Sequence, residues 1–122
     1  MTDYFIGTDI VSVKRIKKII QQHSQRFKER TYTPIEIKYC DSKAVPPIHY
    51  AGRFAAKEAI KKALLSSGIV SNIDFATIEI LSTESGAPEV KLNHAPLDQI
   101  TCKVSISHTC LLYTSPSPRD RG

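Results

Sequence analysis

The chain has 122 residues, of which 41% are hydrophobic, and a formal net charge of +5. This length suits one domain with a modest core, and the charge favours anionic partners such as phosphates or an acidic protein. The chain has no Trp and only 7% aromatic residues, so platforms for base stacking are absent and we expect no nucleic-acid partner.

Three cysteines without a CxxC pair indicate neither a disulfide framework nor a zinc site. No apolar run is long enough to span a bilayer and the first residues lack a signal-peptide core, so we expect a cytoplasmic protein without a membrane partner.

The first elements are a short strand and a basic helix. Residues 4–9 predict a strand that ends at Asp9, and hydrophobic residues at helical spacing predict a helix over residues 13–29 that Ser12 can cap. The opposite face of this helix is a basic stripe made of Lys14, Arg15, Lys17, Lys18, Arg26 and Lys28. Such a stripe is either a solvated face or a docking surface for an acidic partner, and the residue types alone leave both interpretations open.

Two further helices follow. Thr33 and Pro34 form a typical helix start, where Glu36 can complete a capping box, and this short helix reaches about Cys40. A long helix is predicted over residues 47–67, with Gly68 as its stop.

The second half of the chain changes to the period-two pattern of strands. Residues 75–82 and 89–92 predict a hairpin around the turn at 84–88, and residues 103–108 predict another strand with Val104 and Ile106 facing inward. A helical turn is expected at 94–100. A strand, then helices, then several strands indicate an α+β domain with a small antiparallel sheet packed against a long helix and shorter helices.

The long helix carries a carboxylate that could take part in chemistry. Ala51, Ala55, Glu58 and Lys62 share one face, and the cations near Glu58 are Arg53, Lys57, Lys61 and Lys62. The helix is either an exposed one with a Glu58–Lys62 ion pair or one side of a metal–phosphate site. Asp9 at the strand end and His108 near the end of the last strand are the other candidates for such a site, because Mg²⁺ takes one or two protein carboxylates plus phosphate oxygens.

Five motifs in this order resemble the holo-(acyl-carrier-protein) synthase family of small phosphopantetheinyl transferases. They span most of residues 4–109 and read IGTDIV at 6–11 with Arg15-Ile16, TPIE at 33–36, AGRFAAKEA at 51–59, SGAP at 85–88 and VSISHT at 104–109. The resemblance implies the phosphopantetheinyl transferase fold and transfer of the 4′-phosphopantetheine arm of coenzyme A to a serine of apo acyl carrier protein, with release of adenosine 3′,5′-bisphosphate.

The resemblance also implies roles for individual residues. Asp9 and Glu58 would be the catalytic pair and the Mg²⁺ ligands, and Glu58 could take the serine proton directly or through a metal-bound water. The positions that would bind coenzyme A are Arg53, Lys62, Gly86, Pro88 and His108. The basic first helix, with Arg15 foremost and Lys14 and Lys18 beside it, would receive the carrier protein, and the enzyme would be a homotrimer. The alternative from the residues alone is a non-catalytic basic module that binds an acidic protein or nucleic acid.

Residues 110–122 break the pattern of the chain. Two prolines in Ser-Pro-Ser-Pro exclude a central strand, and one choice of codons for residues 110–120 spells a common transposase-type sequencing adapter. We therefore expect residues 1–109 to be a single domain that is incomplete at its C-terminus, and residues 110–122 to be translated adapter. Because the family continues with another strand at this point, we expect the 122-residue chain to be poorly folded or weakly active.

Overall fold

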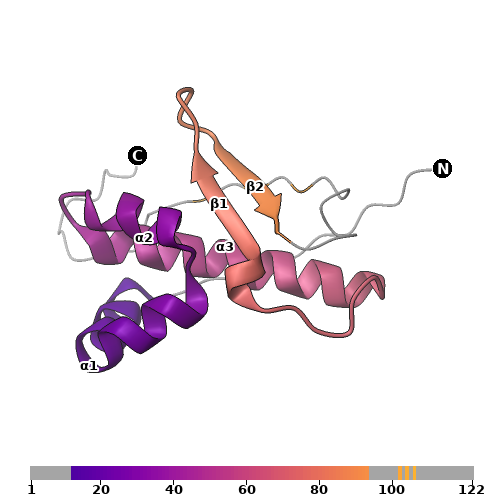
Figure 1. The fold of residues 1–122 in the computed structure, drawn as a ribbon, viewed down its shortest axis with the longest axis horizontal. Helices are drawn as coiled ribbons and strands as arrows, with labels where there is room; N and C mark the ends of the chain where they lie inside the picture. Colours follow the sequence, from indigo (N-terminus) through magenta and orange to yellow (C-terminus); the bar gives the residue numbers. More distant parts are fainter. Residues whose placement is uncertain (1–11, 94–101, 103, 105, 107–122) are drawn as a thin grey trace, which may run out of the picture.

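A computed structural model describes residues 12–93 together with Cys102, Val104 and Ile106. The elements of this part are α1 (Val13–Thr31), α2 (Pro34–Asp41), α3 (Pro46–Ser67), the 3₁₀ helix η1 (Phe75–Thr77), β1 (Ile78–Ser82) and β2 (Pro88–Leu92). In Figure 1, α3 passes behind the β1–β2 hairpin, and α1 and α2 lie towards the end at which α3 begins. Helices packed beside a small antiparallel sheet confirm the predicted α+β class. The elements predicted at 4–9 and 94–100, and most of the strand predicted at 103–108, lie outside the described residues.

The helix ends follow the predicted capping chemistry. The Ser12 hydroxyl accepts a hydrogen bond from the Arg15 amide at 3.2 Å, and Thr33 and Glu36 form both halves of a capping box. Gly68 ends α3 in the left-handed region at φ 78°, which a residue without Cβ adopts readily. α1 is not straight, because His23 has non-helical backbone angles and the helix kinks there.

The hairpin begins later than the sequence predicts. β1 and β2 pair antiparallel with Ile80 opposite Val90 and Ser82 opposite Pro88. The prediction of a strand from residue 75 is wrong, since residues 75–77 form η1. The Thr77 amide donates to the Asp74 carbonyl at 3.0 Å, so its hydrogen bond closes a turn instead of extending the ladder.

α3 contributes to two hydrophobic clusters. The first packs the later part of α3 against the hairpin and contains Ala56, Ile60, Leu64, Ile73, Ile78, Ile80 and Leu92. Cys102, Val104 and Ile106 pack against this cluster, which confirms the predicted inward direction of Val104 and Ile106. The second joins α1, α2 and the start of α3 and contains Val13, Ile16, Tyr32, Cys40, Tyr50 and Ala51. Within the part of the chain described, no helix has both the length and the apolar character needed to cross a membrane.

Candidate functional site

The charged side chains of α3 occupy three different surroundings. Arg53 and Lys57 are buried with 4% and 0% of their surface exposed, Glu58 is half-buried and Lys62 is exposed. The sequence predicted that these cations surround Glu58, but the ammonium group of Lys57 pairs with Glu36 inside the protein instead. Lys57 lies on the side of the helix that faces the core, so its ammonium group ends inside the protein.

Arg53 links α3 to the end of β1. Its Nη2 donates to the Ser82 hydroxyl at 3.0 Å, and its guanidinium carbon lies 4.2 Å from the centre of the Tyr39 ring, a cation–π contact. The Nε of Arg53 is buried, and no described residue accepts its hydrogen bond. An unpaired buried donor costs free energy, so this nitrogen favours a ligand that brings an acceptor such as a phosphate oxygen.

Tyr39 and Lys43 lie beside Arg53 and Ser82, and we call these four residues the cationic corner. The Lys43 ammonium lies 4.6 Å from the centre of the Tyr39 ring. A hydrogen bond with Ser82 and the nearby charges of Arg53 and Lys43 lower the pKa of the Tyr39 hydroxyl below its ordinary value, against a smaller opposing effect of burial. Our sequence reasoning missed Tyr39, Lys43 and Ser82, because only the fold brings α2, its following loop and β1 together.

The hairpin turn borders a cavity next to this corner. Residues 83–87 connect the strands, with Gly86 at φ 88° and its amide donating to the Thr83 carbonyl at 2.9 Å. The cavity has a volume of about 450 Å³ and is lined by Thr83, Ser85, Ala87, Pro88, Glu89, Val90, Cys102 and Val104. The structure thus places Pro88 at a cavity and Gly86 in the turn that forms its rim. Arg53 contacts Ser82, the residue directly before that turn.

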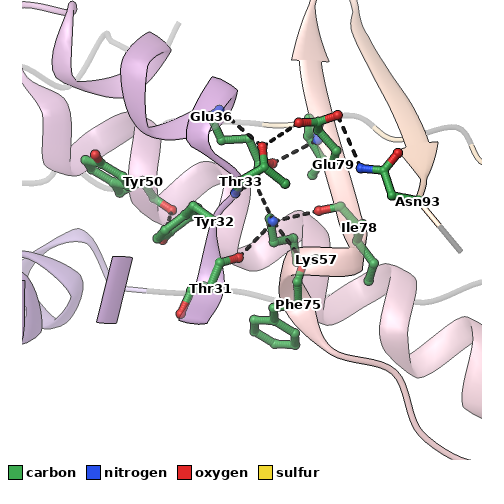
Figure 2. A network of polar contacts seen from close by, with 11 residues as sticks. Thr31, Tyr32, Thr33, Glu36, Tyr50, Lys57, Phe75, Ile78, Glu79 and Asn93 are labelled. Atoms are coloured by element: carbon green, nitrogen blue, oxygen red, sulfur yellow. Dashed lines mark hydrogen bonds and ion pairs between the residues drawn. The ribbon is translucent and has the colours of Figure 1, made fainter. Parts of the chain in front are cut away.

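The ammonium group of Lys57 is the centre of a buried polar network, shown in Figure 2. It lies 2.6 Å from Glu36 Oε1 and donates to the carbonyls of Thr31 at 2.8 Å, Phe75 at 2.9 Å and Ile78 at 2.6 Å. Burial lowers the pKa of Lys57, and the Glu36 carboxylate opposes that change. These acceptors come from the end of α1, from α2, from η1 and from β1.

The Glu36 carboxylate is also saturated with donors. Oε1 accepts from the Thr33 amide at 2.8 Å, and Oε2 accepts from the Ile80 amide at 2.8 Å. The Thr33 hydroxyl donates to Glu79 Oε2 at 2.5 Å, and the side-chain Nδ2 of Asn93 donates to Glu79 Oε1 at 3.3 Å. The capping box was predicted from sequence, whereas the partnership of Glu36 with Lys57 was not.

The residues predicted to receive a carrier protein lie together on α1. Lys14, Arg15 and Lys18 are exposed, while Val13 and Ile16 of the same turns are buried in the second cluster. The first part of the basic stripe is therefore an exposed surface of the described structure, whereas Lys28, beyond the kink at His23, is half-buried. The role of the stripe in docking stays a prediction.

Asp9 and His108 lie outside the described residues, so their predicted place beside Glu58 is not tested. Among the residues that are described, no group of three or more His, Cys, Asp and Glu side chains could hold a metal ion. The half-buried carboxylate of Glu58 does provide the hard oxygen ligand that Mg²⁺ prefers. The donor chemistry of the described part is thus compatible with magnesium, and Asp9 is the predicted second ligand.

Comparison with known proteins settles the family. Residues 5–111 match the 4′-phosphopantetheinyl transferase superfamily. The chain belongs to this superfamily. It is 45% identical over 103 residues to the holo-[acyl-carrier-protein] synthase of Chlorobaculum parvum, an alignment that covers 84% of this chain and 86% of the relative. The sequence-based assignment to the synthase family is confirmed.

Solved structures of the same family share the fold. The Helicobacter pylori holo-[acyl-carrier-protein] synthase, solved in complex with coenzyme A, is 37% identical with a TM-score of 0.69 and covers 84% of this chain and 89% of its own. The Neisseria meningitidis synthase is also 37% identical, with a TM-score of 0.63 over 75% of this chain and 72% of its own. The phosphopantetheinyl transferase fold predicted for this chain is confirmed.

Proposed function

We propose that this chain transfers the 4′-phosphopantetheine group of coenzyme A to a serine of apo acyl carrier protein in a magnesium-dependent reaction. The observation that carries the proposal is family membership over residues 5–111, together with a relative that is a coenzyme A complex. The cationic corner beside the hairpin cavity supports it. There the buried, unpaired Nε of Arg53 favours an anionic ligand.

In the proposed reaction the carrier-protein serine attacks the phosphorus that bears the pantetheine arm. The bond from this phosphorus to the bridging pyrophosphate oxygen breaks, and adenosine 3′,5′-bisphosphate leaves. Arg53 and Lys62 hold phosphate charge, Gly86, Pro88 and His108 adjoin the nucleotide, and Glu58 accepts the serine proton. Asp9 and Glu58 would hold Mg²⁺, which when bound neutralises charge on the pyrophosphate.

The exposed basic face of α1 is the proposed docking surface for the carrier protein. Lys14, Arg15 and Lys18 share that face and present three cations to solvent. Opposite charge on the partner would speed encounter and set its orientation. A homotrimer remains a prediction from the family resemblance, and a cytoplasmic location remains a prediction from the lack of a long apolar run and of a signal-peptide core in the sequence.

The function is tested by incubating the 122-residue chain with apo acyl carrier protein, coenzyme A and Mg²⁺. Intact-mass spectrometry detects even slow transfer as the addition of one phosphopantetheine group. A carrier protein with its acceptor serine replaced by alanine is the control. Transfer that is absent at high enzyme concentration, or that persists with this control, contradicts the proposal.

We also propose that residues 1–109 are the transferase domain and that residues 110–122 are not native to it. The last recognised motif ends at Thr109, the family match ends two residues later, and the adapter-like peptide begins at Cys110. The nucleotide sequence tests this proposal, because codons other than those of the adapter would contradict it.

A further inference from the structure

A single buried lysine connects the two hydrophobic clusters directly beside the proposed metal ligand. Its ammonium contacts Thr31 and Glu36 on the side of α1 and α2, and Phe75 and Ile78 on the side of the hairpin (Figure 2). An ammonium group has three donors, and here four acceptors from four segments converge on it. Lys57 therefore fixes one point of α3 relative to every other described element except β2.

The network is balanced in charge but is not an obvious source of stability. This part of the core holds two cations, Lys57 and Arg53, and two carboxylates, Glu36 and Glu79, and all four side chains are at most 5% exposed. A buried ion pair often contributes no more stability than apolar residues of the same volume, because removing the charges from water is costly. Such a pair instead fixes the relative orientation of the segments that it joins, because hydrogen bonds depend on direction whereas apolar packing does not.

The direction imposed on α3 determines where the proposed site residues point. Glu58 is the next residue along the helix, and Arg53 lies one turn before Lys57 on the same side. Arg53 reaches Ser82 and Lys57 reaches the Ile78 carbonyl, so α3 is attached to β1 at two points four residues apart on each element. These two attachments oppose both rotation and sliding of the helix. A catalytic group needs placement within roughly 0.5 Å, and small rotations of a helix move its side-chain tips further than that.

We propose that Lys57 and Glu36 are positioning residues, which hold α3 so that the Glu58 carboxylate and the Arg53 guanidinium face the bound magnesium and phosphates. Neither side chain is assigned a contact with the substrates, because described residues already occupy the Lys57 ammonium and the Glu36 carboxylate, whereas Arg53 keeps an unpaired Nε. This inference rests on the proposed function. It adds that the accuracy of the site depends on an ion pair to which neither the family resemblance nor the motif analysis gave a role.

The deciding variant replaces both charges, Lys57→Met/Glu36→Gln. It removes both charges of the pair, and the glutamine keeps an oxygen for the Ile80 amide. The carbonyls of Thr31, Phe75 and Ile78 lose their donor, so we expect thermal unfolding that is still cooperative but at a lower temperature than in the unaltered chain. We expect kcat to fall about 10–100-fold while the KM for coenzyme A stays within about threefold. Mn²⁺, added as an electron paramagnetic resonance probe for the magnesium position, should bind about 10–100-fold more weakly.

The matched control is Lys38→Met, which removes an exposed lysine from α2. It should change neither kcat nor Mn²⁺ binding. A double variant that unfolds cooperatively but keeps the kcat and Mn²⁺ affinity of the unaltered chain overturns the inference. The proposed function stands in that case, provided that the unaltered chain is active and Glu58→Gln is not. An inactive unaltered chain contradicts the proposed function and the inference together.

A milder variant tests the positioning role if the double variant does not unfold cooperatively. Thr33→Val keeps the side-chain shape but removes the hydrogen bonds to Glu79 and to the Glu36 amide. With the fold intact by circular dichroism, the inference expects kcat to fall about threefold or more and Mn²⁺ binding to weaken in parallel. Unchanged values for both measurements count against it.

Discussion

α1 and α3 are both rich in lysine and arginine, yet they place these side chains in opposite surroundings. On α1, Lys14, Arg15 and Lys18 are exposed, whereas on α3 the buried Arg53 and Lys57 contact backbone carbonyls, carboxylates and a tyrosine ring. The reason is position, because α1 packs into one hydrophobic cluster while α3 contributes to both. A run of charges therefore indicates a solvated face only where a helix has a free face.

The two helices also differ in what their charges can do. Exposed charges on α1 act over about 8–10 Å of screened solvent, which suits attraction of a large acidic partner. Buried charges on α3 act on atoms in contact with them, which suits fixing geometry. Substitutions on α1 should therefore change partner binding, whereas substitutions on α3 should change stability or catalysis. Five predictions test this contrast and the effect of burial on charge, from the largest expected effect to the smallest.

Lys57→Met should strongly destabilise the fold. The change leaves the Glu36 carboxylate without its cation in a site where neither side chain is exposed. Removing one partner of a buried pair typically costs about 3–5 kcal/mol of unfolding free energy. Urea unfolding followed by circular dichroism measures the loss, and a change below 1 kcal/mol would contradict a stabilising role for the Lys57–Glu36 pair.

Glu58→Gln should abolish most activity and leave the fold unchanged. Glu58 is half-buried, and the amide is close in shape, so stability should change by about 0.5 kcal/mol or less. Loss of a group that accepts a proton in the reaction costs about 10²–10⁴-fold in kcat. The transfer assay measures this, and activity equal to that of the unaltered chain would exclude Glu58 from the site.

Reversing the charge of α1 should weaken docking without affecting chemistry. In the triple variant Lys14→Glu/Arg15→Glu/Lys18→Glu we expect the KM for the carrier protein to rise about 10–100-fold at an unchanged kcat. Stability should not fall, because acidic residues in the first turn interact favourably with the helix dipole. Steady-state kinetics at low and high salt measure the effect. A lower kcat with unchanged KM would remove α1 from the docking surface.

The buried thiol on α2 should make the fold sensitive to alkaline pH. Burial raises the pKa of Cys40 from 9.0 to about 12, so between these values the unfolded chain loses a proton that the folded chain keeps. Stability therefore falls as pH rises through this range, by about 1.4 kcal/mol per pH unit for one proton. Burial also raises the pKa values of Tyr32 and Tyr50, which act in the same direction, while the lowered pKa of Lys57 acts against them.

Cys40→Ala is the matched variant for this pH dependence. It should be less stable near neutral pH because it leaves a cavity, but its unfolding free energy should fall less steeply between pH 9 and 11. Chemical denaturation at several pH values measures both slopes. Identical slopes would mean that the thiol does not contribute.

Lys28→Met should have the smallest effect. Lys28 and Asp41 form an ion pair at 3.4 Å, but their side chains are 17% and 48% exposed. Exposed pairs contribute about 0–1 kcal/mol, and salt screens them. Comparison of this variant with Lys57→Met under the same denaturation conditions measures directly how burial changes the contribution of a lysine–carboxylate pair.

Much of the fold was predictable because its signals are local. The capping box at Thr33 and Glu36, the stop at Gly68 and the hairpin around Gly86 each depend on residues a few positions apart. The start of β1 was mispredicted, since alternation continues through residues 75–77 while their hydrogen bonds close a turn. The pairing of Glu36 with Lys57 could not be predicted from residue spacing, because the two residues are 21 positions apart in the chain and belong to different helices.

The sequence by itself determined the family, the α+β class, the helix ends and the candidate residues of the AGRFAAKEA motif, because these depend on local patterns and motif order. Only the tertiary structure decided that Arg53 and Lys57 of that motif face the interior. It also decided that Tyr39 and Ser82 contact Arg53, that Lys43 contacts Tyr39, and that Glu36 neutralises Lys57. The physical reason is that burial and ion pairing depend on which segments pack together, and distant segments leave no periodic signal in the chain.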